Sequence, residues 1–469
     1  MKTEPIGPPP LYPLKQSETI TADSPASLQG KVGVIEFDDM GELWDRCSLD
    51  EGAPSCQLRE VLSWVEAEST AAENAGARPI TLVFIHGWHH NANSKDDNLN
   101  RFQKKIFDLQ TDADRRDGSS KKTRYIGVYL GWRARTLKAP TWSRLSWADP
   151  DYGAFFDRET TAGRTSLVSM EETLLRLREA SKGSNSSSGA APKPLFLVIG
   201  HSFGGLIVER IMSQMLTETI VTKDGTGECI KPLADLIVLL NPAADGILTQ
   251  ETIDMMRRSK VRTCATKRIG SDDDLAPPLI VSVTSVGDIA TGKLYVGGHG
   301  ISQIHMAFRK YPNCPFCGSN PPNQGTLYRH TAGHMPFFHN FCYLDGTGTT
   351  GDPICDQEQL FLGIESPHEE SGTVIRSVAR NAAPAKELRA YAQSDLSGGE
   401  FHTGVANLYR RCVTCLDPRR APDCGQNWNT TGYWILSVPV SLSKGHDDIW
   451  NDNMSLFLKN VIDATAFTR

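Results

Sequence analysis

The sequence lacks the features that would assign the protein to a membrane or to nucleic acid. Its 469 residues carry a formal net charge of −6, so no basic excess indicates binding to nucleic acid or to anionic lipid. Long hydrophobic runs are also missing. The longest, such as Leu236–Leu240, are far shorter than the roughly 20 residues that cross a bilayer. We therefore expect neither a nucleic-acid partner nor a transmembrane segment.

The first residues lack the apolar core of a secretory signal. Residues 1–15, MKTEPIGPPPLYPLK, are rich in proline instead, and we expect residues 1–28 to form a disordered arm. The expected location is the cytoplasm, with leaderless export left open. The eleven cysteines are an odd number, and in a reducing compartment they are expected to be free thiols.

The clearest positive signal is the stretch Pro194–Ile211, PLFLVIGHSFGGLIVERI. Its apolar, β-branched first part predicts a strand buried on both faces, and its last part predicts a helix. Glycines two residues before and two after Ser202 allow a tight turn between them. The serine is then exposed at the N-terminus of a helix, where negative charge is stabilised. This context favours a nucleophilic serine over an incidental one.

At these residues the chain resembles the α/β-hydrolase superfamily, and within it the serine esterases and lipases. The resemblance implies a mostly parallel, doubly wound sheet of eight strands with helices on both faces. It also implies a catalytic triad of serine, acid and histidine in that chain order, with no cofactor. The similarity covers the segments that form the sheet and is weak elsewhere.

Further apolar runs predict the rest of an α/β domain, because strands alternate with amphipathic helices. The first run, Lys31–Phe37, also has the turn residues of a hairpin at the sheet edge. The other expected strands are Pro79–Ile85, Arg124–Leu130, Leu195–Ile199, Leu233–Leu240, Pro278–Thr284 and Gly432–Ser441. The expected helices are Leu58–Glu68, Ser94–Thr111, Met170–Ala180 and Ile449–Ile462.

A long insertion interrupts this pattern before the last strand. We expect residues 29–288 to form the first part of the core and residues 432–469 to form its last strand and helix. Residues 289–431, dense in Gly, Pro, Cys and His, show little periodicity and too few apolar runs for a core of their own. A loop of this length is uncommon without a function. The expectation is that it lies against the α/β domain and covers the mouth of the active site.

The base and the acid of the triad are predicted from their positions along the chain. His446 comes after the last predicted strand and before the closing helix, where the base is expected. The acid belongs at the carboxyl end of a strand, and both Asp288 and Asp245 qualify. The resembling family most often places the acid after the penultimate strand, which favours Asp288. A loop carboxylate that only caps a helix is the alternative for either.

Two backbone groups are predicted to hold the oxyanion. One is the N–H of Phe203, directly after the serine. In the resembling family the other comes from the loop after a His-Gly pair, here His86-Gly87, and Trp88 is the simplest donor. His86 itself is expected to shape this loop through hydrogen bonds.

No metal site is predicted. His89-His90-Asn91 lacks a spaced third ligand. Two C-x-x-C pairs could form a zinc site, disulfides or free thiols, and these alternatives stay open. The pairs are Cys314 with Cys317 and Cys412 with Cys415, with Cys424 nearby. A looser group is expected to be ordinary polar residues, and it consists of His330, His334, His339 and Cys342.

The predicted function is hydrolysis of a carboxylic ester, of a small molecule or a lipid, through an acyl-enzyme. The aromatic segment Trp142–Phe156 could supply an acyl pocket or lid, or plain core packing. The alternatives on the same triad are a lipase or phospholipase, possibly an exported effector, an amidase and a peptidase. A non-enzymatic binding protein of the same fold is the alternative of another class.

Overall fold

The computed structural model describes two compact units of one chain. They comprise Met1–Val208 and Glu209–Arg469, and the boundary falls within helix α5 (Phe203–Lys223). The described residues are 18–19, 31–44, 56–92, 96–118, 122–132, 134, 155–166, 168–184, 192–223, 233–258, 278–302, 306–308, 323–343, 359–364, 383–384, 408–411 and 432–468.

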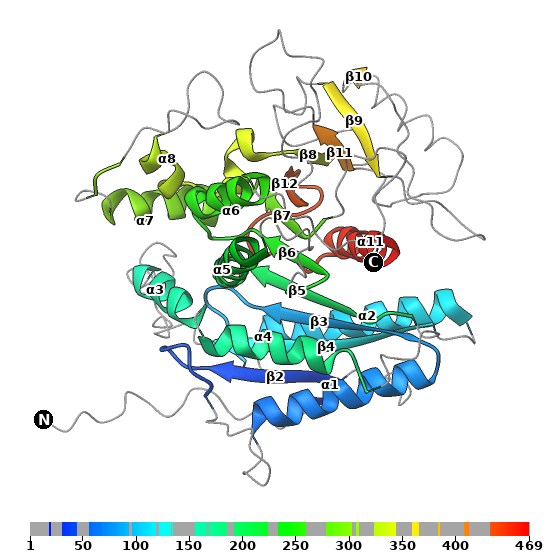
Figure 1. Ribbon diagram of the computed structural model, residues 1–469. Helices are drawn as coiled ribbons and strands as arrows, with labels where there is room; N and C mark the ends of the chain where they lie inside the picture. Colours follow the sequence, from blue (N-terminus) through cyan, green and yellow to red (C-terminus); the bar gives the residue numbers. More distant parts are fainter. Residues whose placement is uncertain are drawn as a thin grey trace, which may run out of the picture. The chain divides into compact units, whose positions relative to one another are not determined.

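Parallel strands form the sheet of the first unit (Figure 1). In spatial order they are β2 (Lys31–Phe37), β4 (Thr123–Trp132), β3 (Arg78–Ile85) and β5 (Leu195–His201). The two-residue strand β1 (Glu18–Thr19) pairs antiparallel with β2. Every residue of β5 is buried, as expected for parallel strands whose two faces are both covered.

Helices cover both faces of this sheet. Gly33 of β2 faces Val61 of α1 (Gln57–Asn74), whereas Gly127 of β4 faces Ile106 of α2 (Asp97–Asp117). Gly127 is the register partner of Val32, the neighbour of Gly33. Because successive side chains of a strand point to opposite faces, α1 and α2 lie on opposite sides. The described residues of the unit also include α3 (Phe155–Thr165) and α4 (Val168–Ala180), of which α4 packs beside α1.

The expected hairpin after the first strand is reduced to a single bridge. Phe37 pairs with Leu43 across a tight turn, while the extended partner of β2 is β4, in parallel. The difference has a physical cause. Residues 32–37 are all buried, and a strand buried on both faces belongs between covered neighbours and not at an exposed edge.

The second unit has its own parallel strands, β6 (Leu236–Leu240), β7 (Ile280–Ser285) and β12 (Tyr433–Val438). All seven strands predicted from apolar runs are therefore present, four in the first unit and three in the second. Among the described residues, the helices of this unit include α6 (Gly246–Arg258), α7 (Tyr295–Ser302), α8 (Gln324–Arg329) and α11 (Asp452–Thr468). The resemblance implied a sheet of eight strands, whereas the apolar runs predict seven.

Strand pairing continues within residues 289–431, where the sequence shows little periodicity. Strand β8 (Phe341–Tyr343) lies parallel to β12, and the sheet continues beyond it. Next come β11 (Leu408–Arg411), β9 (Gln359–Ile364) and β10 (Ala383–Pro384), each antiparallel to its neighbour. Strands β8, β10 and β11, of two to four residues, are too short to produce a readable alternation in sequence.

Cysteine chemistry also differs in part from the expectation of free thiols, because Cys56, just before α1, is disulfide-bonded. Both C-x-x-C pairs and Cys424 lie outside the described residues, as does the aromatic segment from Trp142 to Tyr152. Within the described ranges, no helix is long and apolar enough to span a membrane.

Candidate active site

Ser202 occupies the turn between β5 and α5. Its φ is 55°, in the left-handed region that non-glycine residues rarely adopt. The Ser202 carbonyl accepts a hydrogen bond from Leu206 N–H at 3.2 Å, so the serine is the cap residue of α5. Such strain persists only where the surroundings enforce it, and it is concentrated at functional sites.

Close backbone packing enforces this turn. A Cβ on Gly204 would lie 2.1 Å from the carbonyl oxygen of Ile85, at the end of β3. A Cβ on Gly87 would lie 2.5 Å from the Cβ of Ser202. The loop after β3 therefore rests directly on the serine, and glycine is the only residue that fits at either position.

His86 shapes this loop, as expected. The ring is fully buried and stacks on Trp132 with an interplanar angle of 4°. Its Nε2 accepts from the backbone N–H of Trp132 at 3.0 Å, so the ring hydrogen lies on Nδ1 and is donated to Gly87 O at 2.8 Å. Burial lowers the pKa of His86 to about 4, despite its two backbone bonds. A neutral, buried ring of this kind orients backbone and does not transfer protons.

Trp88 and Phe203, the two predicted oxyanion donors, lie next to each other in the first unit. Their ring centroids are 6.4 Å apart. Phe203 is the first residue of α5, and Trp88 follows the glycine that rests on Ser202. Their backbone N–H groups thus belong to the two segments that meet at the serine. Their role as donors stays a prediction.

The residues His90 and Asn91 bond to the residue that caps the N-terminus of α2. The carboxylate of Asp96, the cap residue of α2, accepts from His90 Nδ1 at 3.2 Å and from Asn91 N–H at 3.2 Å. Burial acts to raise the pKa of Asp96, but the bonded His90 outweighs it and the net direction is downward. This pairing accounts for His90 by local structure.

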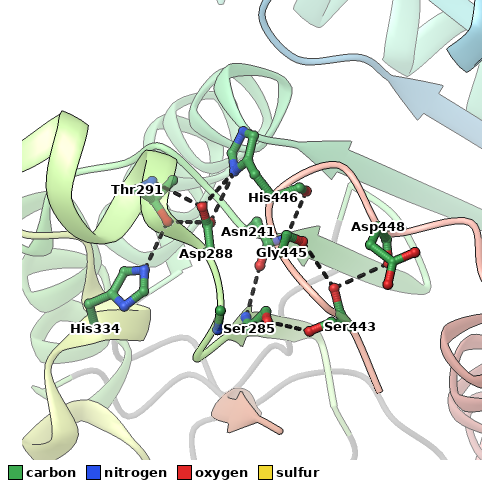
Figure 2. A network of polar contacts seen from close by, with 10 residues as sticks. Asn241, Ser285, Asp288, Thr291, His334, Ser443, Gly445, His446 and Asp448 are labelled. Atoms are coloured by element: carbon green, nitrogen blue, oxygen red, sulfur yellow. Dashed lines mark hydrogen bonds and ion pairs between the residues drawn. The ribbon is translucent and has the colours of Figure 1, made fainter. Parts of the chain in front are cut away.

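In the second unit, Asp288 and His446 form a hydrogen-bonded pair (Figure 2). Asp288 follows β7, and its side chain is fully buried. Both carboxylate oxygens lie 3.0 Å from His446 Nδ1. Burial opposes charge on each group, yet the pairing prevails: the pKa of His446 is raised and that of Asp288 is lowered. The pair fixes the imidazole hydrogen on Nδ1 and leaves Nε2 as the basic nitrogen.

Asn241, a residue the sequence analysis missed, holds the histidine loop to the strand ends. It follows β6 with a φ of 45°. Its Nδ2 donates to the carbonyls of Gly445 and His446 at 3.2 and 2.9 Å, and its Oδ1 accepts from Ser285 N–H at 2.9 Å. One amide side chain thus joins three segments. An Asn-Pro dipeptide directly after a buried strand was the available signal.

Asp245, the alternative acid, begins a helix. Its Oδ1 accepts from Leu248 N–H at 2.9 Å, in the first turn of α6. This is the capping role weighed against catalysis in the sequence analysis. The geometry therefore pairs His446 with Asp288 and places Asp245 in a structural role.

The looser histidine group divides into separate interactions. His330 Nδ1 bonds to Thr326 O at 2.9 Å, and His339 Nε2 donates to Gly333 O at 3.0 Å. These two are ordinary polar residues, as expected. His334 differs, because its Nε2 lies 2.9 Å from Thr291 Oγ1, and the Thr291 hydroxyl also contacts Asp288 (Figure 2).

Comparisons with known proteins add little to this site. No family model and no curated protein matches the chain. A solved structure described as an uncharacterized protein from Pseudomonas aeruginosa is similar to it at 11% identity and a TM-score of 0.21. The match covers 50% of this chain and 40% of that one. A similarity this low supports no argument about fold or activity.

Proposed function

We propose that the protein is a serine hydrolase of the α/β-hydrolase type that cleaves carboxylic esters through an acyl-enzyme. The observation that carries the proposal is the backbone of Ser202, which has φ 55° at a strand-to-helix turn. Glycines pack against this turn so closely that no side chain fits. A serine held in this way is the nucleophile elbow of that fold.

The proposal assigns one role to each remaining residue. His446, with its hydrogen fixed on Nδ1 by Asp288, takes the proton of the Ser202 hydroxyl on Nε2 as the serine attacks the acyl carbonyl. The N–H groups of Phe203 and Trp88 stabilise the oxyanion. His446 then protonates the leaving alcohol, and water releases the acid by the same route. The chemistry requires no cofactor.

A fluorophosphonate probe and a panel of p-nitrophenyl esters of increasing chain length test this proposal. The probe should label Ser202, and Ser202→Ala should lose both labelling and ester hydrolysis by several orders of magnitude. Ser169→Ala is the matched control, because Ser169 carries another hydroxyl of the first unit, and that hydroxyl bonds to Glu42 on the surface. Labelling that persists in Ser202→Ala would refute the assignment. Chain-length preference distinguishes an esterase from a lipase.

A further inference from the structure

Behind the Asp288 carboxylate, a chain of polar contacts leads away from His446 into the insertion. Thr291 donates to Asp288 twice, through its backbone N–H to Oδ1 at 3.1 Å and through its hydroxyl to Oδ2. The hydroxyl is in turn 2.9 Å from His334 Nε2. Figure 2 shows the four side chains in sequence, from His446 through Asp288 and Thr291 to His334. The proposed triad uses only the first two.

The hydrogen positions along this chain follow from the groups involved. An ionised carboxylate only accepts hydrogen bonds, so the single hydroxyl hydrogen of Thr291 is donated to Asp288. The Thr291 oxygen must then accept from His334, which therefore carries its hydrogen on Nε2. Every donor in the chain thus points toward Asp288, and each bond polarises the next.

The protein holds His334 in place from both sides. On one side, Thr331 forms a bridge with Asp245, and Gly246 N–H donates to His330 O at 2.8 Å. A Cβ on Gly333 would collide with Thr284 of β7, so the backbone here lies directly on that strand. The turn that carries His334 is thus fixed at the end of β7, which Asp288 follows.

On the other side, Asn340 ties the same segment to β12. Its Nδ2 donates to Tyr433 O at 2.8 Å, and its Oδ1 accepts from Ile435 N–H at 2.7 Å. The Asn340 side chain therefore bonds to the backbone of β12 much as a neighbouring strand would. A histidine anchored at both flanks against a buried acid is a positioned group, in contrast to a surface residue that makes one chance contact.

We propose that Thr291 and His334 are positioning residues that hold the Asp288 carboxylate in place and share its negative charge with His446. The insertion thereby contributes two residues to the active-site network. The catalytic part of this inference rests on the proposed function, whereas the effect on His446 does not. Without the Thr291 hydroxyl, Asp288 loses a donor, its charge acts more strongly on His446, and His334 N–H loses its acceptor.

Several titratable groups face this network and must be considered in any pH measurement. Burial lowers the pKa of His334. The nearby His339, His330 and His446 lower it further, whereas Asp288 acts to raise it. His446 also faces Asp447, which raises its pKa together with Asp288. His334 is therefore neutral when His446 titrates, and the Nε2–H donor persists through that transition.

Histidine-selective NMR of the full-length protein tests the proposal without any turnover. With ¹⁵N-labelled histidine, the signals of His446 are identified by their loss in His446→Gln. Thr291→Val should raise the pKa of His446, and Thr291→Ser, which restores a hydroxyl, should return it to the parent value. His334→Phe should shift it in the same direction, whereas the matched variant His330→Phe should not.

The kinetic arm uses the best ester of the panel. Thr291→Val should lower kcat about tenfold with little change in KM, as expected for one lost hydrogen bond to a charged group, and Thr291→Ser should recover most of the rate. A His446 pKa that stays at the parent value in both Thr291→Val and His334→Phe overturns the proposal. If the NMR shifts appear but Ser202→Ala retains parental ester hydrolysis, the proposed function fails while this inference stands.

Discussion

At the scale of single residues, the two aspartates that follow buried strands are expected to have different roles, Asp288 in catalysis and Asp245 in stability. Asp288→Asn should reduce kcat by roughly 10³–10⁴, because an amide favours the wrong imidazole tautomer of His446. Asp245→Ala should leave kcat near the parent value and cost about 1 kcal/mol of stability, because it removes the cap of α6. Ester kinetics and thermal unfolding of both variants check this. A larger loss of kcat in Asp245→Ala would move the acid to that residue.

A second residue-scale prediction concerns glycine. Gly204→Ala places a methyl group 2.1 Å from the Ile85 carbonyl oxygen, and overpacking of this kind should destabilise the protein by about 1–3 kcal/mol or prevent folding. Gly297→Ala is the matched control. It lies exposed in α7 with nothing within 4 Å of its Cβ, and it should stabilise the helix by about 0.5–1 kcal/mol. Thermal unfolding that ranks the two variants in the opposite order would contradict the packing argument.

At the scale of elements, one buried carboxyl joins three of them. Glu209 of α5 accepts from Tyr433 of β12 and from Thr249 of α6, each at 2.6 Å. Burial raises the pKa of Glu209 from 4.5 to about 7, although both bonds oppose the rise. The folded state therefore binds the proton more tightly than the unfolded state. This contribution to the free energy of unfolding is present at pH 4.5 and is lost as the pH rises to 7.

Glu209→Gln should remove this loss, because a glutamine carbonyl accepts the same two bonds and does not titrate. Between pH 4.5 and 7 the parent should lose roughly 3 kcal/mol more than the variant. Denaturant unfolding across that range measures the difference. Glu218→Gln, an exposed change on the same helix, should keep the parental pH dependence. If the parent and Glu209→Gln show the same slope, Glu209 is ionised in the folded state.

The elements also show what the sequence could predict and why the rest could not be predicted. The long strands, such as β3 and β5, were found because a continuous β-branched run bounded by turn residues is a local signal. The contacts of Asn241, Thr291 and Asn340 could not be found, because each depends on a partner that lies far away in the chain or on a fold-dependent turn. The choice between Asp288 and Asp245 likewise needed geometry, since both follow buried strands.

At the scale of the whole molecule, one part of the insertion is bound to β12. Deleting residues 300–425 would remove His334, Asn340 and β8 together, and β12 would lose the partners of its backbone at Tyr433 and Ile435. We expect that variant not to fold. Deleting residues 346–430 with a flexible linker of about a dozen residues, the length that joins parallel neighbours, should keep a cooperative thermal transition.

The shorter deletion also tests the predicted cover over the active site. If residues 346–430 cover it, the deletion variant should hydrolyse the ester panel with weaker selectivity. The parent protein, measured beside it, is the reference. A folded deletion variant with unchanged rate and selectivity would show that this part of the chain is an appendage.

The register of β12 on β7 has a consequence for how the protein is made. Tyr433 pairs with Ile280, so 433 − 280 = 153 residues must leave the ribosome between the two partners. All strands of the first unit end by His201, and His446 follows Ser202 by 446 − 202 = 244 residues. At about 5–20 residues per second, that interval lasts roughly 10–50 s. Translation therefore delivers the serine turn well before its proposed base, and a chain interrupted between them carries the first without the second.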